Sequence, residues 1–347
     1  MVCPGFRKYY RGGHLIGYRA VLDIPWDLFW YVHALLERRR VQVGTRRGRR
    51  ALSVYAQTRL VLRRLPDCPD YANLARELGI SVSTVQRMCT EGVEALAAQA
   101  PDLDDLIARI LREGWPYVIA DGLVVPTDKL ASYNVKMGRL AKLSHIRGEE
   151  AEPVPDPQEP AAELLEASTD PPQPPLEGEK LKHAEALVER LRTDGRRSDP
   201  SYSGKHRLDG MNLQVIASPF GDLLWISEAA TGRTHDSTAV KTTGLPQALA
   251  EAGITVLADL AYGSVPGWKT MFKRPAKGKL TGQQVAFNTF FAPLRAPVER
   301  AIWTLTGHWR ILRHNPGDPH DTATTARACL TLHLWLAPNR PSRHTAY

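Results

Sequence analysis

The sequence is poor in cysteine and has no long apolar run. Its 347 residues include four cysteines, and none of them shows the CxxC spacing of a zinc site. Neither a structural zinc site nor a disulfide framework is therefore predicted. No apolar run approaches the ~20 residues of a membrane span, and the N-terminus has no apolar segment of the kind that a signal peptide needs. We therefore expect a cytoplasmic protein with no membrane partner.

Basic residues outnumber acidic ones. The chain has 45 Lys and Arg against 37 Asp and Glu, which gives a formal net charge of +8. This balance favours a polyanionic partner such as nucleic acid. The length accommodates about two domains, at roughly 100–200 residues per domain.

Residues 1–105 are predicted to form a helical DNA-binding region with a helix-turn-helix at about 71–90. Gly79 permits a left-handed turn residue, and Ser81 is placed to cap the second helix. The apolar positions expected to face inward are Leu74, Ala75, Leu78, Ile80, Val82, Val85 and Met88. An ordinary helical hairpin is the alternative interpretation of this segment.

The second helix of that pair would present polar side chains outward. These side chains are Ser83, Thr84, Gln86 and Arg87. A recognition helix places its base- and phosphate-contacting residues in this way. The upstream basic run at Arg46, Arg47, Arg49 and Arg50 supports a nucleic-acid partner, although such a run is also typical of a solvated surface.

Residues 137–199 have a different composition from the rest of the chain. Eight prolines and many carboxylates lie between Glu149 and Pro175. Such a composition cannot bury enough apolar surface to offset the entropy of ordering. We predict an acidic, proline-rich insertion that is largely disordered.

The remaining segments, 112–136 and 200–335, are predicted to form one α/β domain. Strands are expected at 117–120, 211–217 and 223–227, and a further strand ends at Asp259. A helix is expected from Ser237 to Ala252 with Asp236 as its cap, and another from Pro297 onward. A mixed sheet flanked by helices is the simplest packing of these elements.

Three acidic residues of this domain have settings that suit metal chemistry. Asp121 and Asp259 each close an apolar run, and Glu299 is expected one turn into a helix. Mg²⁺ prefers such oxygen ligands, and two ions can stabilise the attacking and leaving oxygens of a phosphodiester displacement. Turn-forming aspartates and a helix-end glutamate paired with Arg295 or Arg300 are the alternatives.

Five short motifs of the chain resemble those of a known family. They are Tyr202-Ser203-Gly204-Lys205-His206, Asn212-Leu213-Gln214-Val215, Gly232-Arg233-Thr234-His235-Asp236-Ser237, Ala258-Asp259-Leu260-Ala261-Tyr262-Gly263 and Pro297-Val298-Glu299-Arg300. In their order and spacing they resemble the DDE-type transposases of bacterial insertion sequences, in the branch related to Harbinger elements. The resemblance covers most of the chain.

The resemblance implies an RNase H-like fold and two-metal phosphoryl transfer. Asp121, Asp259 and Glu299 would be the catalytic, metal-binding triad for two Mg²⁺ ions, which Mn²⁺ can replace. The partners would be double-stranded DNA, as terminal inverted repeats and as target. A dimer or larger assembly on paired ends and an association with the bacterial nucleoid are implied as well.

The resemblance also assigns supporting residues. Asp236 and His235 would lie beside the metal ligands, with Asp236 as helix cap or alternative ligand. Lys205, His206 and Arg300 are candidate DNA contacts, although His206 could be a turn residue and Arg300 could pair with acidic neighbours. Tyr262 could stack on a base or pack in the core, and Trp303 has no assigned role.

Some positions depart from the family pattern. Leu260 and Ala261 stand where Lys and Gly are commoner, and Thr306-Gly307 is expected to interrupt the helix after Glu299. An inactive or domesticated DNA-binding protein and a plain metal-dependent endonuclease therefore stay as alternatives to an active transposase.

Overall fold

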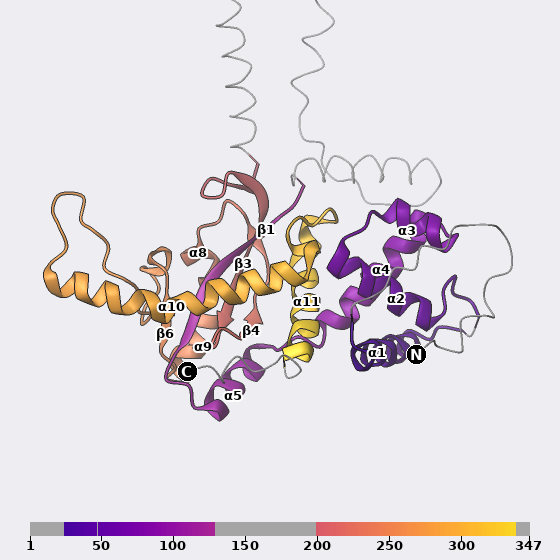
Figure 1. Ribbon diagram of the computed structural model, residues 1–347, viewed down its shortest axis with the longest axis horizontal. Helices are drawn as coiled ribbons and strands as arrows, with labels where there is room; N and C mark the ends of the chain where they lie inside the picture. The colour runs from indigo at the N-terminus through magenta and orange to yellow at the C-terminus, as the bar shows by residue number, and fades with distance from the viewer. Residues whose placement is uncertain (1–23, 47, 129–198, 338–347) are drawn as a thin grey trace, which may run out of the picture.

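The structure, a computed structural model, describes residues 24–46, 48–128 and 199–337 (Figure 1). The predicted insertion at 137–199 lies outside these ranges except for its last residue. No helix within the described ranges has the length and apolarity that crossing a membrane requires.

The N-terminal part of the chain is helical, as predicted. It comprises α1 (Trp26–Gln42), α2 (Val54–Asp67), α3 (Tyr71–Leu78), α4 (Val82–Ala97) and α5 (Leu103–Glu113). Side-chain oxygens cap α2 to α5 at their N-termini. Each such bond satisfies a backbone N–H that has no partner inside its helix.

The helices α3 and α4 meet at a three-residue turn. Gly79 has φ of 65°, the left-handed conformation that glycine adopts without a steric penalty. The Ser81 side chain accepts a hydrogen bond from the Thr84 amide at 3.2 Å. Val85 and Met88 are buried, but Val82 is 42% exposed, so its predicted inward position is wrong. As the first residue of α4, Val82 lies beyond the surface that α3 covers.

A mixed sheet forms the centre of the fold. Its longest strands are β1 (Val118–Pro126) and β3 (Leu208–Ala217), which pair antiparallel, and β6 (Val256–Ala258) runs parallel to β1. Three short strands complete the sheet by pairing with β3: β2 (Tyr202–Ser203), β4 (Leu223–Ile226) and β5 (Ala230–Thr231).

The first strand does not end at Asp121, in contrast to the prediction. Asp121 lies opposite Val215, and the pairing continues as far as Pro126 opposite Gly210. Leu123 and Val125 continue the apolar alternation and are buried, which extends the strand past the Asp-Gly pair. Asp121 is therefore held on both sides by regular β-structure.

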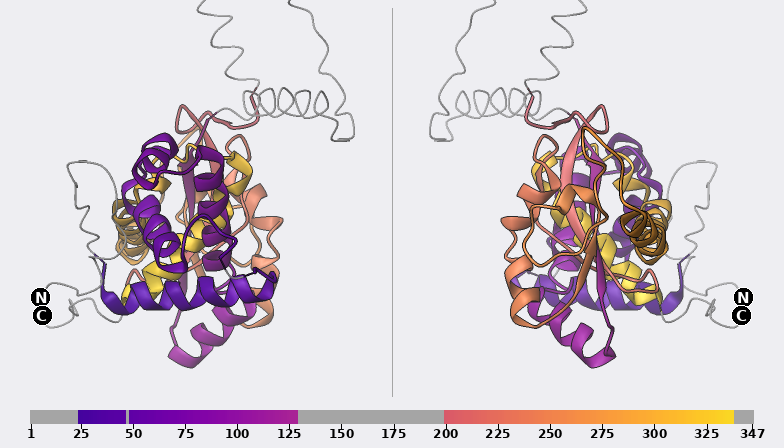
Figure 2. Two further views of the ribbon diagram at one scale, coloured as in Figure 1. Left: turned by 90° about the vertical axis from the view of Figure 1, so that its right-hand side faces the viewer. Right: turned by 90° about the vertical axis from the view of Figure 1, so that its left-hand side faces the viewer.

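Helices cover both faces of the sheet (Figure 2). The helices α8 (Asp236–Lys241) and α9 (Leu245–Glu251) pack with α5 on the face that bears Ala120 and Ile216. The opposite face, with Leu123 and Val215, packs against α10 (Gly282–His308) and α11 (Thr322–Leu336). Short 3₁₀ turns lie at η1 (Leu260–Tyr262), η2 (Arg310–Leu312) and η3 (Pro319–Asp321).

The helix predicted from Ser237 to Ala252 is two helices, and His235 rather than Asp236 caps the first of them. The helical hydrogen bonding is interrupted at Thr243, whose hydroxyl donates to the Val240 carbonyl and accepts from the Leu245 amide. Side-chain hydrogen bonds of this kind compete with the helical ladder. Gly244 follows with φ of 73° and is the N-cap residue of the second helix.

The helix predicted from Pro297 onward is α10, and it begins earlier than predicted. Pro297 lies inside α10, and the helix starts at a capping box between Thr281 and Gln284. The Thr306-Gly307 pair does not interrupt it, because α10 continues to His308. Arg313 supports this end by donating to the carbonyl oxygens of Thr306 and Gly307 at 3.0 and 3.2 Å.

The N-terminal helices share one apolar core with the sheet. Buried side chains of α1, α2 and α4 join those of β1, β3, α10 and α11 in a single cluster. The Thr331 hydroxyl of α11 donates to the Leu96 carbonyl of α4 at 2.9 Å. The domain boundaries stay a prediction, while the packing fixes the position of α4 relative to α11.

Close packing between α2 and α4 makes a stability prediction. A Cβ on Gly92 would lie 2.3 Å from the Val61 side chain. Overpacking of this kind costs typically about 1–3 kcal/mol, so Gly92→Ala should lower the free energy of unfolding despite the better helix propensity of alanine. Denaturant unfolding measures the change, and Val61→Ala should relieve it in the double variant.

The control for this prediction is Gly282→Ala. No atom lies within 4 Å of a Cβ at Gly282, in the first turn of α10. That variant should match or exceed the stability of the parent. Simple additivity of Gly92→Ala and Val61→Ala would contradict the proposed contact.

Candidate metal-dependent active site

Asp121 projects from the middle of β1 toward α10. It shares a strand face with Ile119 and Leu123, because side chains alternate across a strand. The Oδ1 atom accepts a hydrogen bond from the Gly122 amide at 2.9 Å. The side chain is only 17% exposed, so this carboxylate is positioned by the strand on which it lies.

Asp259 follows β6 on the neighbouring strand. The parallel register pairs Ile119 with Leu257 and Ala120 with Ala258. The next step of this register places Asp259 beside Asp121 on the same face. Strands of one sheet lie about 4.8 Å apart, so the two carboxylates are neighbours. Asp259 also caps η1 by accepting from the Leu260 amide at 2.7 Å.

Glu299 is connected to Asp121 through Arg295. The Arg295 guanidinium donates from Nη1 to Oδ2 of Asp121 at 2.9 Å and from Nη2 to Oε1 of Glu299 at 2.7 Å. Arg295 is 14% exposed, while Glu299 is 63% exposed. The predicted ion pair with Arg295 is therefore present, and the same guanidinium links Glu299 to the strand carboxylate.

Burial raises the pKa of Asp121 above its ordinary value. The Arg295 charge and the Gly122 hydrogen bond oppose this shift, and the negative charge of Asp259 adds to it. The effect of Asp259 on this pKa agrees with the proximity that the strand register indicates. A cation at this position would favour the charged form of both carboxylates.

A second polar group lies on the opposite face of the same strands. The Tyr262 hydroxyl donates to Gln214 at 2.6 Å, Gln214 donates to Asn212 at 3.2 Å, and Asn212 donates to Oδ1 of Asp236 at 2.7 Å. Lys205 approaches Oδ2 of Asp236 at 3.5 Å. Every donor in this chain points toward the Asp236 carboxylate.

This polar chain explains two features of the sequence. A Cβ on Gly122 would lie 2.9 Å from the Asp236 carboxylate, so a larger residue at this strand position would displace that carboxylate. Tyr262 is buried, and its pKa is raised by burial and by the charges of Asp236, Asp121 and Asp259. Its hydroxyl therefore stays protonated as a donor, and of the two roles expected for Tyr262 the structure shows packing in the core rather than an exposed ring that could stack on a base.

Sequence reasoning did not single out Asn212 and Gln214 as functional residues. Both are 2% exposed and lie on β3 among buried apolar residues. Their signal was available, because two amides at alternate positions of an apolar strand need polar partners on one face.

The other predicted residues are distributed over several elements. Lys205 and His206 are exposed after β2, and Arg300 is exposed on α10. His235 caps α8 through Nδ1, which accepts from the Ser237 amide at 3.3 Å. Ser83, Gln86 and Arg87 are exposed on α4, and Thr84 is half-buried. The helices α3 and α4 lie on the side of α11 away from β1 and β6, so the fold does not bring them to the carboxylates (Figure 1).

The three predicted ligands do not converge on one point in this conformation. Within residues 24–46, 48–128 and 199–337, no three His, Cys, Asp or Glu side chains are arranged to hold a metal ion. Arg295 lies between Asp121 and Glu299 instead. The oxygen donors suit a hard divalent cation, and binding all three to it requires both carboxylates to leave this guanidinium.

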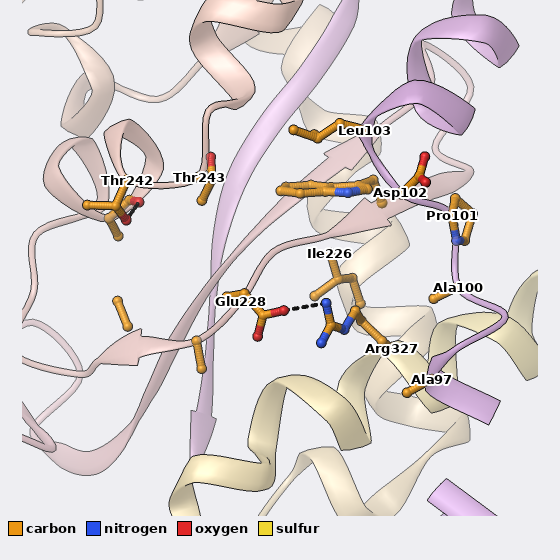
Figure 3. A pocket seen from close by; sticks show the side chains of 14 residues that line it. Ala97, Ala100, Pro101, Asp102, Leu103, Ile226, Glu228, Thr242, Thr243 and Arg327 are labelled. Carbon is orange, nitrogen blue, oxygen red and sulfur yellow. Dashed lines mark hydrogen bonds and ion pairs between the residues drawn. The ribbon is translucent and has the colours of Figure 1, made fainter. Parts of the chain in front are cut away.

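A cavity elsewhere in the fold does not involve these carboxylates. It has a volume of about 340 Å³ and lies between the α4–α5 connection, β4 and the end of α8 (Figure 3). Arg327 of α11 pairs with Glu228 on its wall at 2.5 Å. Neither Asp121 nor Asp259 nor Glu299 lines it.

Comparison with protein families identifies part of the chain. Residues 188–333 match the family described as DDE superfamily endonuclease. This match supports a DDE-type transposase family. The matched range includes Asp259, Glu299 and the polar chain around Asp236, whereas Asp121 lies before it and joins through the β1–β3 pairing. No curated protein and no solved structure matches the chain.

The raised pKa of Asp121 makes a prediction for the metal-free protein. The folded state holds a proton on this carboxyl at a pH where the unfolded chain has already lost it. Its contribution to stability is therefore present at low pH and is lost as the pH rises through the folded pKa. Asp121→Asn should flatten this decline in thermal unfolding with chelator as the pH rises above about 4, the ordinary pKa of an aspartate.

Asp104→Asn, on the exposed surface of α5, is the control for this pH dependence. It should keep the slope of the parent protein. An unchanged slope in the Asp121→Asn protein would show that burial does not perturb this carboxyl.

Proposed function

We propose that the protein is a transposase. It binds the DNA ends of a mobile element, cleaves phosphodiester bonds with two divalent metal ions and joins the freed end to target DNA. The observation that supports this most is that Asp259 directly follows the strand β6, which runs parallel to β1 beside Ala120, while Glu299 is linked to Asp121 by Arg295. Its origin in a bacterial insertion sequence and its Harbinger relation belong to the same proposal.

The three carboxylates are the groups that would hold Mg²⁺ or Mn²⁺. Bound there, two ions would activate the attacking oxygen and stabilise the leaving oxygen of the phosphodiester. Asp121 is held within β1, and Asp259 is held at the end of β6 as the cap of η1, so their positions are set before any ligand binds. Glu299 is 63% exposed and lies on a helix, so its side chain is free to adjust.

Arg295 has two roles in this mechanism. Without metal, its guanidinium bridges Asp121 and Glu299, which offsets part of the repulsion between their like charges. Once those carboxylates release it, the guanidinium becomes an unpaired cation close to where DNA must bind. Arginine suits planar, two-point recognition of phosphate oxygens. Arg300, Lys205 and His206, all exposed, would extend this contact along the strand.

Recognition of the element ends is assigned to α4. Its exposed Ser83, Gln86 and Arg87 follow a capped N-terminus after a short turn, as in a helix that enters the major groove. Double-stranded DNA is the proposed partner, at the terminal repeats and at the target. Pairing two ends requires at least a dimer on DNA, and we place the protein with the DNA in the cytoplasm.

One observation favours a different function. Arg295 already bonds to two of the three carboxylates, and no three His, Cys, Asp or Glu side chains of the described residues are arranged to hold a metal ion. A domesticated DNA-binding protein without cleavage activity would keep such an arrangement. A plain endonuclease would share the metal site but would leave a cut end without strand transfer.

Substitution of the carboxylates tests the proposed chemistry. Asp259→Asn and Glu299→Gln should reduce Mg²⁺-dependent cleavage of terminal-repeat DNA to the metal-free level, because an amide is a poor ligand for this ion. Binding of the same DNA in chelator should stay near that of the parent. Cleavage is measured on end-labelled DNA with and without the metal.

The matched control is Asp128→Asn. Asp128 is half-exposed beyond the end of β1 and pairs with His314 at 3.7 Å. This variant should cleave at the parent rate. An Asp259→Asn protein that cleaves as fast as the parent would remove the triad from the mechanism, and a parent protein that binds but never cleaves would favour the silent DNA-binding protein.

Substitution of α4 tests the recognition of DNA ends. Each good base contact contributes about 1–3 kcal/mol of discrimination, so replacing Gln86 and Arg87 by Ala should weaken binding to terminal repeats by at least ~5-fold more than binding to random DNA. Arg112→Ala, an exposed charge on α5, is the control. Fluorescence anisotropy at fixed salt measures both, and equal losses on the two DNAs would make α4 a scaffold.

The arginines of the basic run before α2 do not all have the same role. Arg50 forms an ion pair with Glu91, which also accepts from Gln57 at 3.0 Å, so Arg50 has a structural role. Arg47 lies outside the described residues. Neutralising Arg46 and Arg49 should weaken binding to every DNA alike and flatten the salt dependence, because phosphate contacts carry no sequence information.

A further inference from the structure

The segment between Asp259 and Glu299 is unusually charged for its length. From Leu260 to Val298 the sequence has no Asp or Glu and six Lys or Arg residues. Four of these, Lys273, Arg274, Lys277 and Lys279, lie in the loop that leads into α10 and are exposed. None of the four forms an ion pair with a carboxylate of the described residues. We call residues 271–291 the arm.

The arm projects beyond the sheet. Figure 1 shows the first half of α10 and its preceding loop extending past β6, on the side away from α1–α4. The apolar stripe of α10 packs against the core at Val298, Ala301 and Leu305. At helical spacing the same stripe continues toward the N-terminus through Phe291 and Phe287, with Phe290 at its edge.

Two of these phenylalanines lack the cover that the core gives to the rest of the stripe. Phe291 is 3% exposed, but Phe287 is 38% and Phe290 is 70% exposed. The rings of Phe272, Phe287 and Phe291 form a connected group, because Phe287 lies 5.1 Å from Phe272 and 5.4 Å from Phe291, and Phe290 is the most exposed ring of this part of α10. Exposed aromatic surface beside unpaired cations marks an interaction site.

The loop of the arm is fastened to the helix. The Asn288 side chain accepts from the Phe272 amide at 2.8 Å and donates to the Phe272 carbonyl at 3.0 Å. This two-point attachment holds the basic loop against the exposed face of α10. The start of the basic loop is therefore preorganised relative to α10, which lowers the entropy that binding must overcome.

We propose that the arm is a second DNA-binding surface, which grips the phosphate backbone through its four basic side chains and places Phe290 against unstacked bases. This inference rests on the proposed function, because it takes DNA as the ligand of the neighbouring carboxylate site. Lysine and arginine beside exposed aromatics is the chemistry of proteins that hold distorted or single-stranded DNA.

Charge decides between DNA and a second copy of this chain. In a two-fold contact the same patch meets itself, so four cations would face four cations. Like charges brought together in an interface cost several kcal/mol. A phosphate backbone provides the opposite charge along the whole loop instead.

The helix sets the place of this contact on the DNA. Phe290 precedes Glu299 by nine residues, which is about 14 Å along the axis of α10. At about 3.4 Å per nucleotide of one strand, this is about four nucleotides from the scissile phosphate. The arm would therefore hold DNA that flanks the cleaved bond.

The aromatic part is tested with full-length protein in chelator, on duplexes with a short unpaired bubble placed two to eight nucleotides from the cleavage site. Phe290→Ala should weaken binding to the bubble at about four nucleotides by on the order of tenfold, and Phe290→Trp should restore it. A 2-aminopurine in the bubble should change its fluorescence with the parent and not with Phe290→Ala. Equal affinity of Phe290→Ala and parent for every bubble would overturn the base contact.

The charged part is tested by replacing Lys273, Arg274, Lys277 and Lys279 by Ala. Binding to any duplex should weaken, and the slope of affinity against salt should become shallower by about four units at most. The control keeps all charges by exchanging Lys for Arg and Arg for Lys at these four positions. An unchanged salt slope in the neutralised variant would overturn the phosphate contact.

The outcomes separate this inference from the proposed function. Arm variants that bind and cleave like the parent would refute the arm while the carboxylate chemistry stands. A parent protein that binds no DNA would refute the proposed function, whatever the arm does. Loss of a dimer in sedimentation of Phe290→Ala, with unchanged DNA affinity, would assign the arm to a second copy and overturn the proposal.

Discussion

The antiparallel pairing of β1 with β3 is the constraint on which the site depends. It runs from Ile119 opposite Ala217 to Pro126 opposite Gly210, and it joins parts of the chain that residues 129–198 separate in sequence. Asp121 lies on one side of this separation, while Asp259 and Glu299 lie on the other. Long regular pairing fixes the register of two strands strongly where a strand face is buried. The position of Asp121 relative to residues 188–333 is therefore fixed, although Asp121 lies before that family match.

The two faces of that strand pair have different chemistry. Asp121 faces α10 and Arg295, whereas Gly122 and Gln214 face α8 and the Asp236 carboxylate. The polar chain from Tyr262 to Asp236 satisfies every buried group along its path, and such networks rigidify the elements they join. It ties η1, which follows Asp259 directly, to β3. The positions of both strand carboxylates are therefore supported from behind the sheet.

Local sequence predicted the strands well and their continuation poorly. Asp121-Gly122 has the composition of a turn, and nothing nearby shows that Gly122 is needed because Asp236 packs against it. That contact joins residues far apart in the chain, so no local pattern contains it. The start of α10 was predictable, since Thr281 and Gln284 have capping-box spacing, but Pro297 gave the stronger signal for a helix start.

In the candidate site too, local relations were predictable from the sequence and contacts between distant residues were not. The i,i+4 relation of Arg295 and Glu299 is visible in sequence, and the ion pair that it predicts is present. The second partner of Arg295 is Asp121, 174 positions away, and only the packing of α10 on β1 reveals it. Asn212 and Gln214 carried a signal in their alternation on an apolar strand, but their partners come from α8 and η1.

The helix α10 connects the candidate catalytic residues with the proposed DNA-binding arm. The 27 residues of α10 span about 40 Å at 1.5 Å per residue. Its C-terminal half is anchored in the core by Val298 and Leu305, its centre holds Arg295 and Glu299, and its N-terminal half carries the arm. A helix fixed at one end transmits position along its length, so DNA held by the arm is placed relative to Glu299 by covalent geometry. The ion pair of Arg295 with Asp121 also fixes the position of α10 relative to the sheet.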